Sequence, residues 1–233
     1  MSAAVRPLNF VDHGNVKINP SRHFPHVAKE QIVPLVVHEF ANASGEMPVV
    51  FVKNSDNGEF TPVAVLGFEQ GENVFFGDTW RGSYVPAVIT HRPFALMPTP
   101  EDASQMQLMV QQTDELMANN EGEALFTEDG SETPYLEKRK NALGKYLEHT
   151  HITKAFVDFL PEHELLVEQT LNLEFDSQKR QLNGVYLVSE AKLNELSDEV
   201  FLNMRKRGYL SAVYAHLMSM QQLNNLARLK SSK

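Results

Sequence analysis

Apolar positions in the first half of the chain predict β-strands joined by tight turns. Residues 48–52 form a β-branched apolar run, and residues 60–68 alternate between apolar and polar side chains. The turn between them ends at Gly58, which accepts a positive φ angle without strain. We therefore predict a β-hairpin over 48–68. Further strands are expected over 32–37, 84–89, 93–97 and 106–112, the last with a single helical turn as the alternative.

From Pro134 onward the apolar positions recur every three or four residues, which predicts helices. One helix is expected over 135–147. A second helix is expected to begin at Thr150, whose hydroxyl can cap it, and to stop before Pro161.

The last third of the chain combines a second hairpin with short helices. Its strands are expected over 165–175 and 182–188, where apolar and polar residues alternate. Two short helices are predicted, the second with a serine cap and a terminating glycine, and a longer amphipathic helix follows them. These helices are expected to start at Ser189, at Ser197 with an end at Gly208, and at 210 with an end at 229.

Together these elements predict an α+β fold. Its sheet is mostly antiparallel and built from hairpins, and its helices gather in the C-terminal third. Residues 1–30 lack a clean period and are expected to form an extended arm, while 31–233 are expected to form a single domain. The acidic, polar stretch 119–134 is interpreted as a loop, with a subdomain boundary there as the alternative.

Composition narrows the function classes. The chain has 233 residues, 21 basic and 30 acidic side chains, and a net charge of −9, so a phosphate backbone would repel it and we expect no nucleic-acid partner. It contains no cysteine, which excludes disulfides and thiolate chemistry. Its beginning does not look like a secretory signal, and no apolar run is long enough to span a bilayer. We therefore expect a cytoplasmic protein with no membrane partner.

The most informative segment is 77–96, which holds the single tryptophan of the chain. Rigid rings beside guanidinium groups supply contact area at low entropic cost and can grip a carboxylate or phosphate. The alternative is that the rings are core and the arginines pair with acids. We predict a ligand-binding site formed by Trp80, Arg81, Tyr84, His91 and Arg92.

Recognisable catalytic and metal motifs are missing from the sequence. It contains no nucleophile elbow, dinucleotide-binding glycine pattern or phosphate-binding loop. His149 and His151 would share a face only on a strand and would diverge on a helix, so we expect no metal and no cofactor. The alternative to a binding protein is an enzyme of unrecognised type that uses His91 or His216 as general acid or base near Arg92.

The tail helix offers an interaction surface as well as a core face. Met218 and Met220 lie among its leucines, and methionine adapts to irregular partners. Packing on the chain's own sheet is one interpretation of this stripe. That packing is the default interpretation. The homodimer that we predict would use the part of the C-terminal helix that the sheet leaves free.

Several blocks, in order along nearly the whole chain, resemble the bacterial SapC family, which is named after a gene at a surface-array protein locus. The most specific blocks are WRGSYVPA at 80–87 and RPFAL at 92–96, with further similarity at 65–75, 125–130, 182–188 and 208–222. The resemblance implies an accessory role in an uptake or modification system, in which a flavin-dependent halogenase-like protein is a partner. It also implies an association with surface layers, but no catalytic residues.

We therefore expect a non-catalytic accessory protein that recognises a small acidic molecule or a peptide. The sequence leaves two alternatives open, the enzyme described above and a structural protein associated with a surface layer. The sequence favours a role without catalysis because it clusters binding groups without any recognisable catalytic set.

Overall fold

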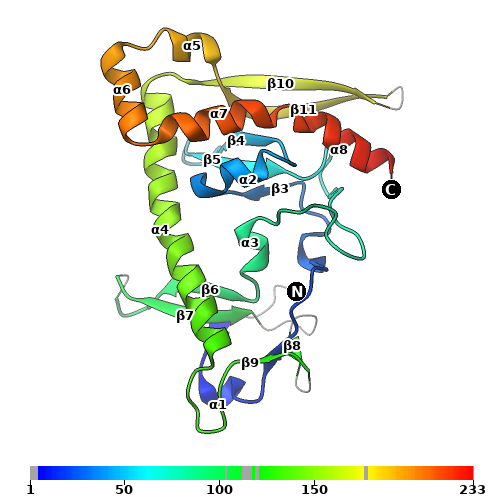
Figure 1. The fold of residues 1–233 in the computed structure, drawn as a ribbon, viewed down its shortest axis with the longest axis vertical. Helices are drawn as coiled ribbons and strands as arrows, with labels where there is room; N and C mark the ends of the chain where they lie inside the picture. The colour runs from blue at the N-terminus through cyan, green and yellow to red at the C-terminus, as the bar shows by residue number, and fades with distance from the viewer. Residues whose placement is uncertain (1–4, 103, 112–116, 119–120, 176–177, 233) are drawn as a thin grey trace. The chain divides into compact units, whose positions relative to one another are not determined.

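The computed structural model describes residues 5–102, 104–111, 117–118, 121–175 and 178–232. The chain divides into two compact units. Unit 1 comprises the residues up to Arg22 together with Ile89–Glu148, and unit 2 comprises His23–Val88 together with His149–Lys233. Helix α4 (Pro134–Glu162) contributes residues to both units (Figure 1).

Unit 2 is organised around a five-stranded antiparallel sheet in the order β10–β11–β4–β5–β3. Both predicted hairpins are confirmed as neighbouring pairs in this sheet. In β4 and β5 consecutive residues are buried, which is the pattern of strands covered on both faces. The strands are β3 (Ile32–Pro34), β4 (Val49–Lys53), β5 (Phe60–Val65), β10 (Leu166–Phe175) and β11 (Gln178–Val188).

Helices cover this sheet, and α7 lies beside α2 and against β4 and β11 (Figure 1). Phe40, Phe51 and Phe156 fill the space between them, with ring centroids 6.0–6.3 Å apart. The helical elements here are η1 (Pro25–Val27), η2 (Val37–Glu39), α2 (Phe40–Ala43), α5 (Glu190–Asn194), α6 (Asp198–Lys206), α7 (Tyr209–Ser219) and α8 (Gln222–Ser231). The predicted cap Ser197 is confirmed, since its hydroxyl accepts a bond from the amide of Val200. Ser189 caps α5 in the same way, through the amide of Lys192.

Unit 1 has its own small core. Two three-stranded sheets, β1–β7–β6 and β8–β2–β9, pack with the first half of α4 around Leu125 and Leu136, which are fully buried. Strands were predicted correctly over 93–97 and 106–112, although residue 112 lies outside the described residues. The elements are β1 (Val5–Pro7), α1 (Phe10–His13), β2 (Lys17–Ile18), β6 (Phe94–Pro98), β7 (Met106–Gln111), β8 (Met117–Ala118) and β9 (Glu123–Ala124).

The strand predicted over 84–89 is wrong, because this segment turns into the short helix α3 (Ala87–Thr90). The amides of Tyr84 and Ala87 donate to side-chain carboxylates, at 3.3 and 2.7 Å, so these donors are not used in a strand ladder. Pro86 has no N–H at all and fixes a φ angle that suits a helix start.

The two helices predicted over 135–160 form a single helix, α4. Thr133 begins it, since its hydroxyl accepts a bond from the amide of Leu136 at 3.3 Å. Thr150 lies inside the helix, where neither glycine nor proline interrupts the chain from residue 145 to 160. Pro161 lies in the last turn, and Glu164 ends the helix with a left-handed φ of 55°.

The single tail helix predicted over 210–229 is also wrong, because it is divided into α7 and α8. The hydroxyl of Ser219 donates to the carbonyl of His216 at 2.6 Å and accepts from the amide of Val49 at 2.9 Å. The helix therefore ends where the Ser219 side chain bonds to a backbone carbonyl in place of the next amide.

The predicted α+β class is confirmed, with antiparallel sheets and the helices mostly in the C-terminal part of the chain.

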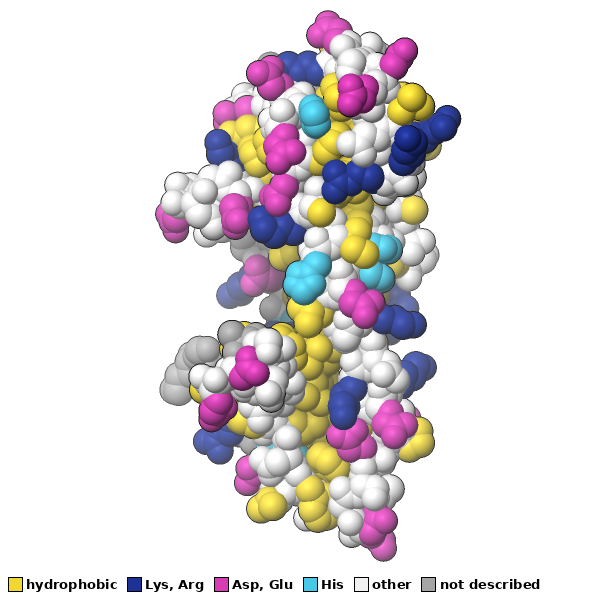
Figure 2. Space-filling model, turned by 90° about the vertical axis from the view of Figure 1, so that its left-hand side faces the viewer, with side chains coloured by type: hydrophobic (Ala, Val, Ile, Leu, Met, Phe, Trp, Pro, Cys, Tyr) yellow, Lys and Arg dark blue, Asp and Glu magenta, His cyan; other side chains and the backbone are white. Residues whose placement is uncertain are grey.

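No helix in the described ranges combines the length and the apolar character that crossing a bilayer requires. Acidic and basic side chains are interspersed over the face drawn in Figure 2, which has no continuous basic patch.

Candidate functional site

Trp80 is a core residue of unit 2, with 5% of its surface exposed. Its ring stacks on Phe75 at a centroid distance of 5.4 Å and meets Phe24 edge-on at 5.9 Å. Its indole N–H donates to the carbonyl of Tyr84 at 2.8 Å, which closes the loop between the two residues. The ring thus fixes the shape of the segment rather than forming an exposed aromatic wall.

Tyr84 is anchored to a buried carboxylate. Its hydroxyl donates to Oε1 of Glu39, which is only 6% exposed. The same carboxylate accepts bonds from the amides of Val36 at 3.0 Å and Ala87 at 2.7 Å. Three donors thus compensate the cost of burying Glu39 and tie 84–87 to η2.

A second carboxylate, that of Glu46, holds the loop that follows Trp80. It accepts bonds from the amide of Ser83 at 2.9 Å and from that of Tyr84 at 3.3 Å. A Cβ atom at Gly82 would lie 2.5 Å from Oε2 of Glu46, so a larger residue there would have to displace the carboxylate. Residues 83–87 of the predicted segment are therefore held in place by Glu39 and Glu46.

Arg81 joins this loop to the end of the chain. Its Nη1 donates to the carbonyls of Val74 at 3.0 Å and Leu229 at 2.9 Å, and its Nη2 donates to Oγ of Ser232 at 2.6 Å. A guanidinium has five N–H groups, so within the described residues these three bonds leave two for another partner.

A pocket of about 360 Å³ lies beside Arg81 in unit 2. It is bounded by the loop of residues 81–83, by Glu46 and by α8. Its wall is mainly polar and carries two guanidinium groups against one carboxylate. The residues that give it this character are Glu46, Arg81, Ser83, Gln222, Asn225 and Arg228.

His91 and Arg92, the other two predicted site residues, belong to unit 1, whereas Trp80, Arg81 and Tyr84 belong to unit 2. The ring of His91 packs edge-on against Tyr146 at 4.9 Å. Burial, assisted by the nearby charge of Arg139, lowers the pKa of His91 to about 4. Arg92 donates to the side-chain carbonyl of Gln111 in β7. The binding role of the five residues stays a prediction.

Among the residues that the structure describes, the other histidines do not form a metal site. His149 and His151 lie on α4, and His149 stacks on His38 with ring centroids 3.6 Å apart. Across the described ranges no three histidine, cysteine, aspartate or glutamate side chains gather in a way that could hold a metal ion.

His216, considered above as a general acid or base, is fully buried with both ring nitrogens engaged. Nε2 accepts a bond from the amide of Val188 at 3.0 Å, and Nδ1 donates to the carbonyl of Val49 at 2.7 Å. Burial lowers its pKa to about 4, although the bond to Val49 acts in the opposite direction. In this position the ring is a structural group.

Sequence reasoning missed the roles of Glu39, Glu46 and Arg228. The two glutamates lie 45 and 37 residues before the donors Tyr84 and Ser83, so no local spacing reveals these pairs. One weak signal was available: an acidic residue at 39 and another at 46 flank short apolar runs in a segment that has few other charges. Arg228 looks like any exposed helical arginine.

Comparison with known proteins supports the resemblance. The model of the SapC family matches residues 8–226 of the 233-residue chain. No curated protein and no solved structure matches the chain. Because the match covers nearly the whole sequence, and includes the loop clamped by Glu39 and Glu46, the chain belongs to the SapC family.

Proposed function

We propose that the protein is a non-catalytic binding protein that holds a small acidic molecule in the pocket beside Arg81. The observation that supports this most strongly is the charge of the pocket wall. Two arginines against one glutamate give it a net charge of +1, in a chain whose net charge is −9. A local excess of positive charge attracts an anion.

The glutamate in the wall repels an anion less than an unpaired carboxylate would. Both oxygens of Glu46 accept bonds from the amide of Ser83, at 3.0 and 2.9 Å. Arg228 donates to Oδ1 of Asn225 at 2.8 Å and is otherwise exposed, so its remaining N–H groups can turn to a ligand. The amides of Gln222 and Asn225 add further donors for carboxylate oxygens.

The pocket volume is near the lower end of the roughly 300–1,000 Å³ that is typical of small-molecule sites. This favours a compact ligand such as a dicarboxylate. Hydrogen bonds from Ser83 and Tyr84 to Glu46 hold the loop in place without a ligand, which reduces the ordering cost of binding. We infer an accessory role for the protein, in which it captures such a molecule without transforming it.

The test is isothermal titration with succinate and with its neutral analogue succinamide. We expect succinate alone to bind. Arg228→Gln should weaken succinate binding roughly tenfold or more, because a charge-assisted bond is lost. Arg205→Gln is the matched control, since Arg205 is an exposed arginine on α6 that does not line the pocket.

Equal binding of succinate and succinamide would contradict the proposal. So would an Arg228→Gln variant that binds succinate as tightly as the Arg205→Gln variant does. Arg81 is a poor choice for this test because its three hydrogen bonds also hold the fold.

A further inference from the structure

A second pocket of unit 2 lies between η2, α2, α4 and the start of α7, and its volume is about 340 Å³. We call it the Tyr209 pocket. Apolar side chains from separate elements, among them Val37, Phe40 and Ile152, supply much of its wall. Phe40 is 1% exposed and Ile152 is 46% exposed, so the wall runs from the core to the surface.

Arg207 is the charged group of this pocket. Its guanidinium carbon lies 4.5 Å from the ring centroid of Tyr209 and 5.6 Å from that of Phe159. The two rings hold the side chain in place while Arg207 stays exposed.

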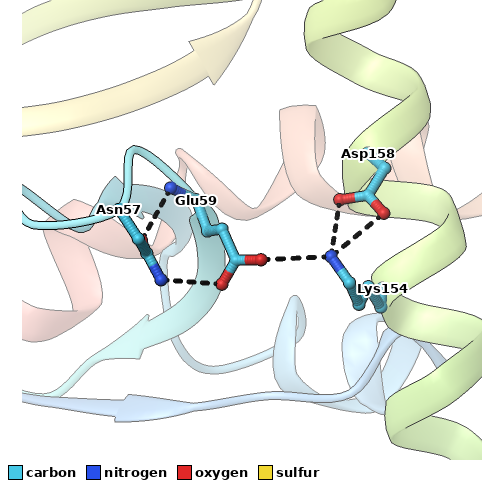
Figure 3. A network of polar contacts seen from close by, with 4 residues as sticks. All are labelled: Asn57, Glu59, Lys154 and Asp158. Atoms are coloured by element: carbon cyan, nitrogen blue, oxygen red, sulfur yellow. Dashed lines mark hydrogen bonds and ion pairs between the residues drawn. The ribbon is translucent and has the colours of Figure 1, made fainter.

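The charge of Arg207 is not neutralised by a neighbouring acid. In the part of the chain that the structure describes, no carboxylate forms an ion pair with its guanidinium. Asp158, which acts on Tyr209, is itself paired with Lys154 at 3.2 Å. Figure 3 shows that Lys154 also reaches Glu59. An arginine fixed on aromatic faces without a carboxylate among the described residues, in a chain with nine excess acids, is a ready anchor for an external anion.

His38 provides a second polar group in the wall. Its ring is stacked on His149 with an interplanar angle of 9°. Burial, and then the proximity of His149, lower the pKa of His38. The ring is therefore neutral at neutral pH and presents one N–H donor and one acceptor.

We propose that the Tyr209 pocket is a second binding site, which takes a small aliphatic carboxylic acid. The tail lies against Val37, Phe40 and Ile152, and the carboxylate meets the guanidinium of Arg207. A mainly apolar wall with a few fixed polar groups is the usual composition of such a site. This site differs in chemistry from the polar pocket beside Arg81, and it does not depend on the function proposed for that pocket.

The experiment uses the full chain, with octanoate as the probe and 1-octanol as its uncharged counterpart. Binding is followed by isothermal titration and by the methyl resonance of Ile152. Octanoate should bind and shift this resonance, and 1-octanol should bind at least tenfold more weakly because it cannot pair with Arg207.

Two variants and two controls locate the site. Arg207→Met keeps the apolar stem over Tyr209 but removes the charge, and it should weaken octanoate binding roughly tenfold or more. Ala41→Trp places a large ring at an exposed position of the wall and should block both probes. Arg205→Met lies two residues earlier, in the last turn of α6 and outside the wall, and Arg228→Gln lies in the other pocket. Both should leave octanoate binding unchanged.

Equal affinity for octanoate and 1-octanol would overturn the assignment of Arg207 as the anchor. Failure of octanoate to bind the wild-type chain, or unchanged binding by the folded Ala41→Trp variant, would overturn the site itself. Loss of succinate binding in Arg228→Gln with octanoate binding intact would show that the two pockets act separately.

Discussion

At the scale of single residues, His216 replaces backbone pairing where the sheet of unit 2 opens. Strands β11 and β4 pair at Val185 with Val52 and at Tyr186 with Phe51. Continued in the same register, Val188 would face Val49. These are the two residues that the imidazole joins, through the Val188 amide and the Val49 carbonyl. The buried ring thus provides hydrogen-bond partners for a backbone N–H and a carbonyl that the strand pairing leaves unpaired.

This geometry predicts an acid-sensitive fold. The pKa of His216 is about 4 in the folded chain against 6.5 as its ordinary value, so the unfolded chain binds the proton more readily. The contribution of His216 to the free energy of unfolding is therefore fully present above pH 6.5. It falls by about 3 kcal/mol as the pH drops toward 4.

Urea unfolding between pH 7 and 4 measures this loss. His216→Gln is the control, because it keeps a donor and an acceptor but does not titrate. The gap between the two stability curves should narrow with falling pH, and parallel curves would contradict the assignment. In the wild type, the ring resonances should show no protonation of His216 until the pH approaches 4.

Glu39 gives a second prediction at this scale. Its carboxylate accepts three donors, so Glu39→Gln places an N–H₂ group against an N–H or O–H and should destabilise the fold by about 2 kcal/mol. Tyr84→Phe removes only one donor and should cost about 1 kcal/mol. Chemical denaturation of both variants checks the order, and a larger loss for Tyr84→Phe would count against a charged Glu39 as the organising group.

The sequence predicted a binding site in residues 77–96, but not the contacts that hold this segment. Tryptophan and glycine mark a fixed loop, and the structure shows which acids fix it, Glu39 and Glu46. These partners are distant in sequence, so no periodicity reveals them. The pocket beside Arg81 could not be predicted either, because α8 completes its wall from the far end of the chain.

At the scale of elements, local patterns predicted the hairpins well and the helix ends poorly. The apolar run of β4 and the alternation in β5, β10 and β11 are properties of neighbouring residues. The division between α7 and α8 arises instead from Ser219, which bonds to Val49 170 residues away. A contact of that range leaves no local trace in the sequence.

Two glycines should respond oppositely to the same substitution. Gly208, between α6 and α7, has a φ of +75° and open space where a Cβ would lie, so Gly208→Ala should destabilise the fold by about 1 kcal/mol through backbone strain alone. Gly144 lies inside α4, also with open space, and Gly144→Ala should stabilise by about 0.5–1 kcal/mol. Thermal unfolding distinguishes the signs, and two losses would refute the explanation.

At the scale of the whole molecule, the spacing of apolar residues along the chain predicted the α+β class. Blocks of residues in a fixed order predicted the family. The division into units did not follow, because unit 1 combines the residues up to Arg22 with Ile89–Glu148. Assembly from separated segments is decided by packing. Local composition at 119–134 carries little information about it.

The homodimer also belongs to this scale and stays a prediction. Tyr214 and Met218, one turn apart on α7, are 46% and 66% exposed. Met218→Glu should weaken self-association by placing a charge on this face. Low salt should weaken it too, because two chains of charge −9 repel each other more when they are not screened. Sedimentation equilibrium measures both effects, and a wild-type chain that stays monomeric at all salt concentrations would contradict the prediction.

The imidazole between β11 and β4 has one more consequence, for deuterium exchange. The amide hydrogen of Val188 is held by a nitrogen that belongs to α7. Its exchange therefore requires α7 to detach from the sheet. The neighbouring amides of the sheet exchange only when the strands separate. This single amide can report on the detachment of α7 while the sheet beneath it remains intact.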